Sequence, residues 1–290
     1  MNHVAERLGY LPDTKLLIIH ADDLGMCHSV NVATFNAFEA GAISSASVMV
    51  PCPWFAEVAE RCRGESSLDI GVHLTITSEW SHYKWRPLSN VNCDTGLVDE
   101  IGHFWPDADS LHASSCHIEV ELEAQVTTAM EAGIDVTHLD SHMCSLFRTD
   151  YAEIYAQTAR KHQLPFLAPI CASPPICASQ VLGKIAFNSD VVVDKLFQAS
   201  PNAPADSWED YYLGVLRSIE SGLSQLTVHL GCDDDELRAI TQHHQAWGAA
   251  WRQRDYDILT SPKFRSALLD NQITVVDWRT VGSILQKPKD

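Results

Sequence analysis

A short apolar run near the start of the chain, residues 15–21 (KLLIIHA), limits the folds available to it. The run is bounded by polar residues and does not alternate between apolar and polar positions, which is typical of a strand buried on both faces. Strands of this kind occur in parallel sheets that helices cover on both sides. We therefore expect an α/β fold with its sheet in the interior.

Similar runs recur along the sequence and alternate with helical patterns. We expect Ser29 to cap a helix that ends at Gly41, because apolar residues recur there at helical spacing and glycine is favoured just after a helix. Ser207 and Ser261 mark two later helix starts. Beyond the first strand, further strands are expected near residues 43–51, 69–76, 135–142, 165–170, 226–231 and 273–278.

Length and composition predict one domain. The chain has 290 residues, of which 46% are hydrophobic, enough to bury the core of one large α/β domain. About seven strands alternating with helices could form an open doubly wound sheet, but the length favours a distorted (β/α) TIM-like barrel of parallel strands. No linker divides residues 1–290, and we expect loop insertions near 78–112 and 171–189.

Charge and cysteine content exclude several kinds of partner and environment. The formal net charge of −18 includes no long acidic block, so it predicts an acidic surface that disfavours nucleic acids and anionic membranes. The nine cysteines are scattered and form no CxxC pair, which is typical of reduced thiols. No segment resembles a signal peptide or a membrane span. We therefore expect a cytoplasmic protein.

Two carboxylates, Asp22 and Asp23, directly follow the first apolar run and precede a glycine-containing turn. Burying both charges at the mouth of a buried strand is costly unless a cation or a shared proton compensates them. Taken alone, the pair has a simpler interpretation, in which one aspartate caps a turn and the other faces solvent.

The run of residues 136–142 (VTHLDSH) is the most informative segment of the sequence. By the period of two in a strand, His138, Asp140 and His142 share one face. Two imidazoles and a carboxylate on one interior face need a metal ion, a proton network or solvent to be tolerated. A functional role is therefore favoured over a packing role.

Two further histidines follow other expected strands. Alternation in residues 70–76 places His73 opposite the aliphatic side chains, and His229 lies at the end of a short apolar run. Because the carboxyl ends of parallel strands meet at one edge of a sheet, these histidines and the residues above converge there. One carboxylate with two histidines suits a divalent ion and leaves coordination positions open, which predicts a catalytic metal site.

Several motifs occur in the order found in one known family. The ADDLG turn, the segments SVNVATFNAFEAG and ISSASVMV, and then GVHLTIT, THLDSH and VHLG resemble the YdjC-like carbohydrate deacetylases. These segments lie within residues 16–231, and a later region is also similar, so the resemblance covers nearly the whole chain. It implies a distorted (β/α) barrel, one divalent metal ion with Mg²⁺ or Zn²⁺ favoured, and removal of the N-acetyl group of amino sugars such as chitooligosaccharides.

The resemblance assigns roles to residues at matching motif positions. It implies that Asp23, His73 and His142 are the metal ligands. Asp22 resembles the catalytic base of the family, and His229, in the segment similar to the HPG motif, is the candidate general acid.

Neighbouring residues then take supporting roles. His138 and Asp140 would orient the metal ligands without binding the metal ion themselves. Trp80, Trp85 and Trp105 could stack on sugar faces, although tryptophans that only anchor a loop are an equally good interpretation.

The chain departs from the usual family motifs at four positions. It has Leu24, Cys144 and Leu230 where the family reads ADDFG, HLDSHxH and HPG, and His20 where asparagine is common. None of the departures removes a proposed ligand, so they bear on specificity more than on activity.

The expected function is that of a metal-dependent hydrolase that removes the N-acetyl group from an amino sugar or an N-acetylated oligosaccharide. Two alternatives stay open: a metal hydrolase of the same fold that acts on a non-sugar amide or a phosphoester, and a catalytically silent sugar-binding protein. The expected partner is an N-acetylated sugar, and the sequence allows a homodimer.

Overall fold

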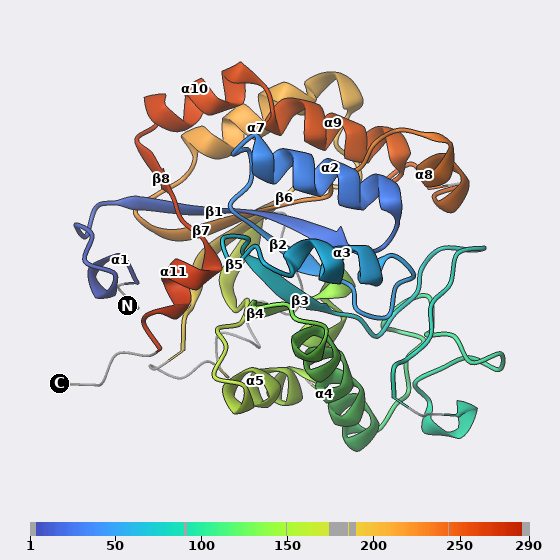
Figure 1. Ribbon diagram of the computed structural model, residues 1–290. Helices are drawn as coiled ribbons and strands as arrows, with labels where there is room; N and C mark the ends of the chain where they lie inside the picture. The colour runs from blue at the N-terminus through green and yellow to red at the C-terminus, as the bar shows by residue number, and fades with distance from the viewer. Residues whose placement is uncertain are drawn as a thin grey trace.

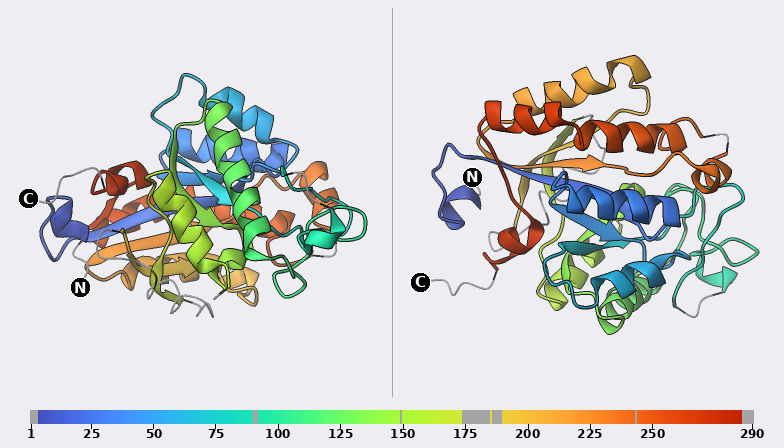
Figure 2. Two further views of the ribbon diagram at one scale, coloured as in Figure 1. Left: turned by 90° about the horizontal axis from the view of Figure 1, so that it is seen from below. Right: turned by 45° about the horizontal axis from the view of Figure 1, so that its top comes forward.

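Parallel strands form the interior of the protein, and helices cover them (Figure 1; Figure 2). The computed structural model describes residues 4–89, 92–148, 150–173, 185, 190–242 and 244–285. The strands are β1 (Lys15–Leu24), β2 (Ser45–Val48), β3 (Ile70–Leu74), β4 (Val136–Ser141), β5 (Pro169–Ser173), β6 (Val193–Gln198), β7 (Gly222–Val228) and β8 (Ile273–Val275). The α-helices are α1 (Val4–Arg7), α2 (His28–Glu39), α3 (Phe55–Cys62), α4 (Ser115–Glu131), α5 (Ala152–Lys161), α7 (Trp208–Arg217), α8 (Asp235–Ile240), α9 (Ala249–Leu259), α10 (Pro262–Asp270) and α11 (Trp278–Gly282).

The sheet has the order β4-β3-β2-β1-β7-β6-β5, with β8 paired to β1. Every pairing between these strands is parallel. The two ends of the sheet approach each other, because Leu139 of β4 bridges to Phe166 just before β5. The sheet thus curls into an incomplete barrel (Figure 1). The expected distorted (β/α) barrel of parallel strands is confirmed.

Helices lie on opposite sides of the curled sheet. In Figure 1, α2, α7, α9 and α10 lie above β1, while α4 and α5 lie below β4. The segment between β3 and α4, which contains the expected insertion at 78–112, extends at the side where the β1 arrow ends (Figure 1). The carboxyl ends of the strands therefore lie on the side of this insertion.

The helix starts agree with the sequence only in part. Ser261 caps α10 by accepting a hydrogen bond from the Phe264 backbone N–H, as expected. The expected cap at Ser29 is wrong, because α2 begins at His28 and the Ser29 hydroxyl donates to Asp234 and Glu236 instead.

Two other helix ends were also predicted from the sequence, one at Ser207 and one at Gly41. Ser207 occupies the N-cap position of α7, but its side chain makes no capping hydrogen bond. Gly41 follows α2 with φ 63°, a left-handed conformation that glycine adopts at little cost, so the expected helix end is confirmed.

One strand was not expected from the sequence. Strand β6 has the sequence VDKLFQ, in which the charged pair Asp194 and Lys195 interrupts the apolar pattern. The second expected insertion, near 171–189, begins within β5, and most of it lies outside the described residues. No helix among the described residues is long and apolar enough to cross a membrane.

Gly71 of β3 allows two strands to pack closely around a histidine. A Cβ atom at this position would lie 2.4 Å from Cε1 and 2.5 Å from Nε2 of His138. We expect Gly71→Ala to lower the free energy of unfolding by about 1–3 kcal/mol, because the buried ring cannot move away without displacing its neighbours. Urea denaturation would measure the change.

Gly214→Ala is the matched control for this prediction. Gly214 lies in α7, where a new Cβ would meet only the Arg217 guanidinium at 3.8 Å. Alanine there should raise stability by about 0.5–1 kcal/mol, because it favours the helix more than glycine does. Equal stability of the two variants would contradict the packing argument.

Candidate functional site

The two aspartates that follow the first apolar run lie at an irregularity of β1. The register of β1 against β2 shifts between Ala21 and Leu24, so that Asp22 and Asp23 together lie opposite Ser47. Asp23 has φ 68°, a left-handed conformation that aspartate tolerates better than most residues. In a regular strand, consecutive side chains point to opposite faces, whereas this bulge turns both carboxylates toward the same cluster.

Asp23, His73 and His142 lie together at the carboxyl ends of β1, β3 and β4. Asp23 Oδ1 is 3.4 Å from His73 Nε2 and 3.2 Å from His142 Nδ1. One ligand atom from each of the three residues lies within 4.8 Å of the others, and all three side chains are buried. The structure therefore brings together the residues expected to hold the metal.

Several polar atoms in this cluster have no hydrogen-bond partner among the described residues. They include Asp22 Oδ1, Asp23 Oδ1 and His73 Nε2, which are buried. Leaving such atoms without a partner is costly, and a cation among them would offset that cost. The cluster therefore fits a divalent metal ion with carboxylate and imidazole ligands.

Two neighbouring groups fit a metal ion less well. They are His20, His138 and Asp140, and a second set of Asp22, His73 and Asp140. Asp140 is already paired, since its Oδ1 lies 2.7 Å from His73 Nδ1 and its Oδ2 lies 2.9 Å from His20 Nε2. The charges of His73 and His20 outweigh burial and lower the pKa of Asp140, which keeps it ionised.

The two proposed ligand histidines, His73 and His142, each have a carboxylate partner on the ring nitrogen that does not face Asp23. Asp140 pairs with His73 Nδ1, and Glu79 Oε2 lies 2.9 Å from His142 Nε2. Such partners fix the orientation of a ligating imidazole and raise its basicity. Glu79 was not expected, because it is a single carboxylate in an irregular segment and belongs to no motif.

Arg252 of α9 also contacts the cluster, and its role was not expected. Its Nη2 donates to Asp23 Oδ2 over 2.6 Å, and both side chains are buried. Although burial favours the neutral carboxyl, the Arg252 charge and the two histidines hold the pKa of Asp23 well below its usual value. Arg252 thus keeps one oxygen of Asp23 occupied and leaves the other facing the histidines.

Asp22 differs from Asp23 because, among the residues that the structure describes, no arginine or lysine pairs with it. Its Oδ1 lies 3.4 Å from His20 Nε2 and its Oδ2 lies 3.8 Å from His73 Nε2. Burial raises the pKa of Asp22 to about 7, against the opposing charges of His73 and His20. Asp22 can therefore exchange a proton near neutral pH.

His229 follows β7 and lies beside Asp22, with its Nε2 3.9 Å from Asp22 Oδ2. Its backbone N–H donates to Asp255 Oδ2 of α9 over 3.0 Å. Burial lowers the pKa of His229 to about 3, and the Arg252 charge acts in the same direction, although Asp23 opposes both. The His229 imidazole is therefore neutral at neutral pH.

His138 packs against aromatic rings rather than against the three proposed ligands. Its ring stacks on Trp278 with centroids 5.1 Å apart, and it meets the edge of His20 at 5.0 Å. Among the described residues, no hydrogen bond joins it to Asp23, His73 or His142. Asp140 contacts the proposed ligand His73, whereas His138 lies beside His20 and Asp140.

The three tryptophans considered as sugar platforms lie in the segment between β3 and α4. Trp80 and Trp85 are only 2% exposed. Their indole N–H groups donate to Met26 Sδ and the Thr77 carbonyl, respectively, while that of the half-buried Trp105 donates to the Gly96 carbonyl. These contacts favour the loop-anchoring interpretation.

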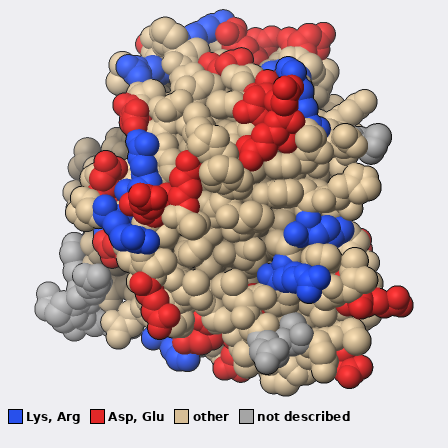
Figure 3. All heavy atoms as spheres, turned by 45° about the vertical axis from the view of Figure 1, so that its right-hand side comes forward, with Lys and Arg blue, Asp and Glu red and all other residues tan. Residues whose placement is uncertain are grey.

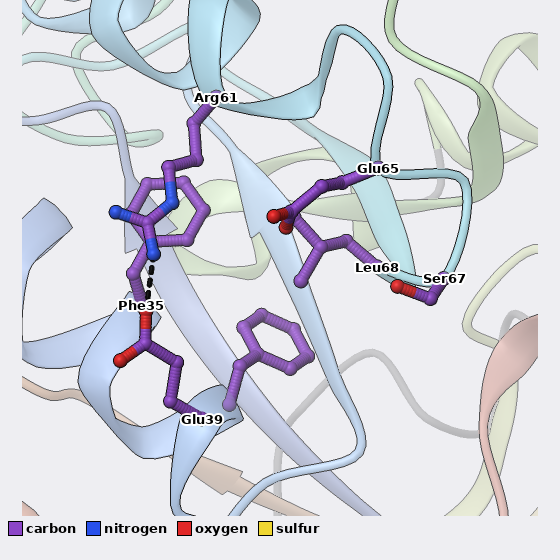
Figure 4. Close-up of a pocket in the computed structure, with 7 residues that line it drawn as sticks. Phe35, Glu39, Arg61, Glu65, Ser67 and Leu68 are labelled. Atoms are coloured by element: carbon purple, nitrogen blue, oxygen red, sulfur yellow. Dashed lines mark hydrogen bonds and ion pairs between the residues drawn. The ribbon is translucent and has the colours of Figure 1, made fainter.

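A separate pocket lies between α2 and α3 (Figure 4). Arg61 pairs there with Glu39, and its guanidinium lies 4.9 Å from the centre of the Phe35 ring. The lining residues are Phe35, Phe38, Glu39, Arg61, Glu65, Ser67 and Leu68. None of them belongs to the cluster around Asp23, so this pocket is separate from the candidate site.

Comparisons with known proteins point to one family. A family model described as YdjC-like protein matches residues 16–270. A carbohydrate deacetylase of Thermus thermophilus is 32% identical over 289 residues, which cover 97% of this chain and 98% of that protein. A chitooligosaccharide deacetylase of Yersinia enterocolitica is 32% identical over 130 residues, which cover 44% of this chain and 49% of that protein.

A solved structure supports the fold. The crystal structure of an Enterococcus faecalis protein described as a cellobiose-phosphate cleavage protein matches with a TM-score of 0.74. The match covers 92% of this chain and 99% of that one at 23% identity. At this identity the likeness concerns the fold alone.

Metal binding at the cluster should depend on pH. The charges of Glu79 and Asp23 outweigh burial and raise the pKa of His142 to about 9, and Asp140 and Asp22 likewise raise that of His73. A cation must displace these protons, so its apparent affinity should rise with pH up to about 9 and binding should release protons. Calorimetry of Zn²⁺ binding in buffers of different ionisation enthalpy would count them.

Glu79→Gln tests the cause of this dependence. Without the Glu79 charge, the pKa of His142 should fall, so metal affinity should depend less steeply on pH. Glu57→Gln, which removes a carboxylate beside His28 outside the cluster, is the control and should behave as wild type. Affinity that does not vary with pH in the wild-type protein would contradict the assignment of the two histidines.

Proposed function

The chain belongs to the family of YdjC-like proteins, and we propose that it is a metal-dependent hydrolase that removes the N-acetyl group from an amino sugar or N-acetylated oligosaccharide. The proposal takes residues 1–290 as one domain. Relatives named carbohydrate deacetylase and chitooligosaccharide deacetylase support the substrate class. The observation that carries the proposal is the buried cluster in which Asp23 Oδ1 and His73 Nε2 have no hydrogen-bond partner within the described part of the chain.

The proposed metal ligands are Asp23, His73 and His142. A divalent ion, with Mg²⁺ or Zn²⁺ favoured, would polarise the acetyl carbonyl and make a bound water more acidic. Arg252 and Asp140 hold two of the ligands in place through hydrogen bonds of 2.6 Å to Asp23 and 2.7 Å to His73. Ligands that are held in this way need little rearrangement when substrate binds.

Asp22 is the proposed base. It accepts a proton from the attacking water, a role that suits a carboxylate whose pKa is about 7. A bound cation would lower that pKa and keep Asp22 ionised below neutral pH. His20, 3.4 Å from Asp22 Oδ1, helps to fix the direction of the carboxylate.

His229 is the proposed acid. Cleavage of the C–N bond needs a proton on the departing amine, because an amide anion is a poor leaving group. His229 is neutral in the resting site, but negative charge that develops on the substrate during attack raises its pKa. Asp255 fixes the backbone of His229 and thereby aims the ring at the site.

The surface around the mouth bears on the alternative substrates. Figure 3 brings forward the side where β1 ends, and the middle of this face is mostly uncharged, with acidic side chains above it and two groups of Lys and Arg to its right. A phosphoester needs cationic groups to bind its phosphate, whereas a neutral N-acetylated sugar does not. The uncharged middle of this face suits a neutral sugar.

Asp22→Asn tests the proposed reaction. The amide side chain keeps the size of the carboxylate but cannot accept a proton, so acetate release should fall at least about 100-fold. The metal content should stay equal to that of wild type, because Asp22 is not a proposed ligand. Acetate release from N-acetylglucosamine oligomers and elemental analysis would measure the two quantities.

Two outcomes would contradict the proposal. Wild-type protein that releases no acetate with Mg²⁺ or Zn²⁺, yet hydrolyses another amide or a phosphoester, would favour the other hydrolase. Wild-type protein that binds the oligomers and hydrolyses nothing would favour a silent sugar-binding protein.

A further inference from the structure

One tryptophan outside the segment between β3 and α4 lies next to the proposed acid. The ring of Trp247 meets that of His229 with centroids 6.2 Å apart and planes at 61°. Trp247 lies between α8 and α9 and is half-buried, so that part of its indole is accessible. Its other neighbour, Trp251, lies 5.7 Å away and is only 2% exposed. Trp247 is therefore the accessible member of an aromatic pair at the site.

The backbone of Trp247 adopts an unfavourable conformation. Its φ is 57°, in the left-handed region that bulky residues rarely occupy. The next residue, Gly248, closes a tight turn, since a Cβ there would lie 2.3 Å from the His244 carbonyl oxygen. Backbone strain at a bulky side chain persists when surrounding contacts enforce it, and it is found most often at functional sites.

The contact that enforces this conformation comes from the catalytic cluster. Arg252 Nε donates to the Trp247 carbonyl over 2.7 Å, while Arg252 Nη2 donates to Asp23 Oδ2 over 2.6 Å. A single buried guanidinium thus fixes both the proposed metal ligand and the strained tryptophan. The backbone of Trp247 is thus tied to the same group that holds Asp23.

We propose that Trp247 is the stacking surface for the pyranose ring whose N-acetyl group is removed. This inference rests on the proposed function. In that reaction the departing nitrogen is bonded directly to the sugar ring and receives its proton from His229. The ring must therefore lie beside His229, where the accessible indole is. The apolar face of a pyranose suits an indole surface, which offers a large rigid area at little entropic cost.

A stacking role predicts a specific pattern of kinetic effects. Trp247→Ala should raise the KM for the N-acetylglucosamine dimer about tenfold, because an aromatic contact of this kind contributes that much affinity. Its kcat should change less than about threefold, because the proposed base, acid and ligands are untouched. Trp247→Phe, which keeps a smaller ring, should lie between Trp247→Ala and wild type.

Binding can be measured without turnover in the Asp22→Asn background with Zn²⁺ bound. Titration with the N-acetylglucosamine dimer should change the tryptophan fluorescence, and the added Trp247→Phe substitution should abolish most of that change. Trp54→Phe is the matched control, because Trp54 is 37% exposed and packs on His28 away from the cluster. It should keep the full fluorescence change and the affinity of its parent.

A purely structural role must be separated from stacking. Trp247→Gly removes the indole but tolerates a positive φ, so it should unfold at a higher temperature than Trp247→Ala. Both variants should nevertheless lose dimer affinity to the same extent. Affinity that follows the unfolding temperature of the variants would overturn the proposal, as would Trp247→Ala with unchanged KM and dimer affinity.

The proposed reaction and the proposed stacking surface can be contradicted independently of each other. Wild-type protein that releases acetate while Trp247→Ala matches it in KM overturns the stacking surface and leaves the reaction intact. Wild-type protein that releases no acetate, but whose dimer affinity falls in Trp247→Ala, overturns the reaction and supports the stacking surface.

Discussion

The carboxylate of Asp23 is the point on which the site depends. One oxygen accepts a hydrogen bond from Arg252, and the other faces His73 and His142 without a hydrogen-bond partner among the described residues. A buried carboxylate with one free oxygen is stable only if a further positive charge lies close to it. The fold provides two imidazoles that face this oxygen at the mouth of the barrel. The packing therefore places positive charge at this oxygen, either as protons on the two imidazoles or as a metal ion that displaces them.

The local backbone is distorted where these groups meet. The bulge in β1 allows two consecutive aspartates to face one cluster, and Asp23 adopts a left-handed conformation within it. Trp247 also has a positive φ, and Arg252 holds both residues through hydrogen bonds. Strain of this kind lowers stability and is retained where it positions functional groups. The rigid barrel supplies the contacts that offset it.

Sequence periodicity predicted the parts of the site that lie on regular strands. Asp140 could be placed because alternation holds along β4, His142 directly follows the end of that strand, and the barrel followed from the apolar runs. Alternation could not show that Asp22 and Asp23 share a face, because a bulge breaks the period, and only family resemblance distinguished their roles. Alternation also placed His138 on the interior face of β4 with Asp140, where its ring meets the edge of His20.

Contacts between segments that are far apart in the chain were difficult to predict from the sequence. Arg252 is 229 residues from Asp23 along the chain. The sequence did contain one indication that α9 contributes to the site. Arg252 and Asp255 are three residues apart, so two charged side chains share the buried face of this helix. Glu79 and Trp247 lie outside regular elements, where no periodicity indicates the direction of a side chain.

The most direct test of the account is a crystal structure of the protein with Zn²⁺, with the ion located by anomalous scattering. The account predicts one ion within about 2.3 Å of Asp23 Oδ1, His73 Nε2 and His142 Nδ1, at distances typical of zinc ligands. An ion held instead by His20, His138 and Asp140, or no ion at Asp23 in protein that releases acetate, would contradict it.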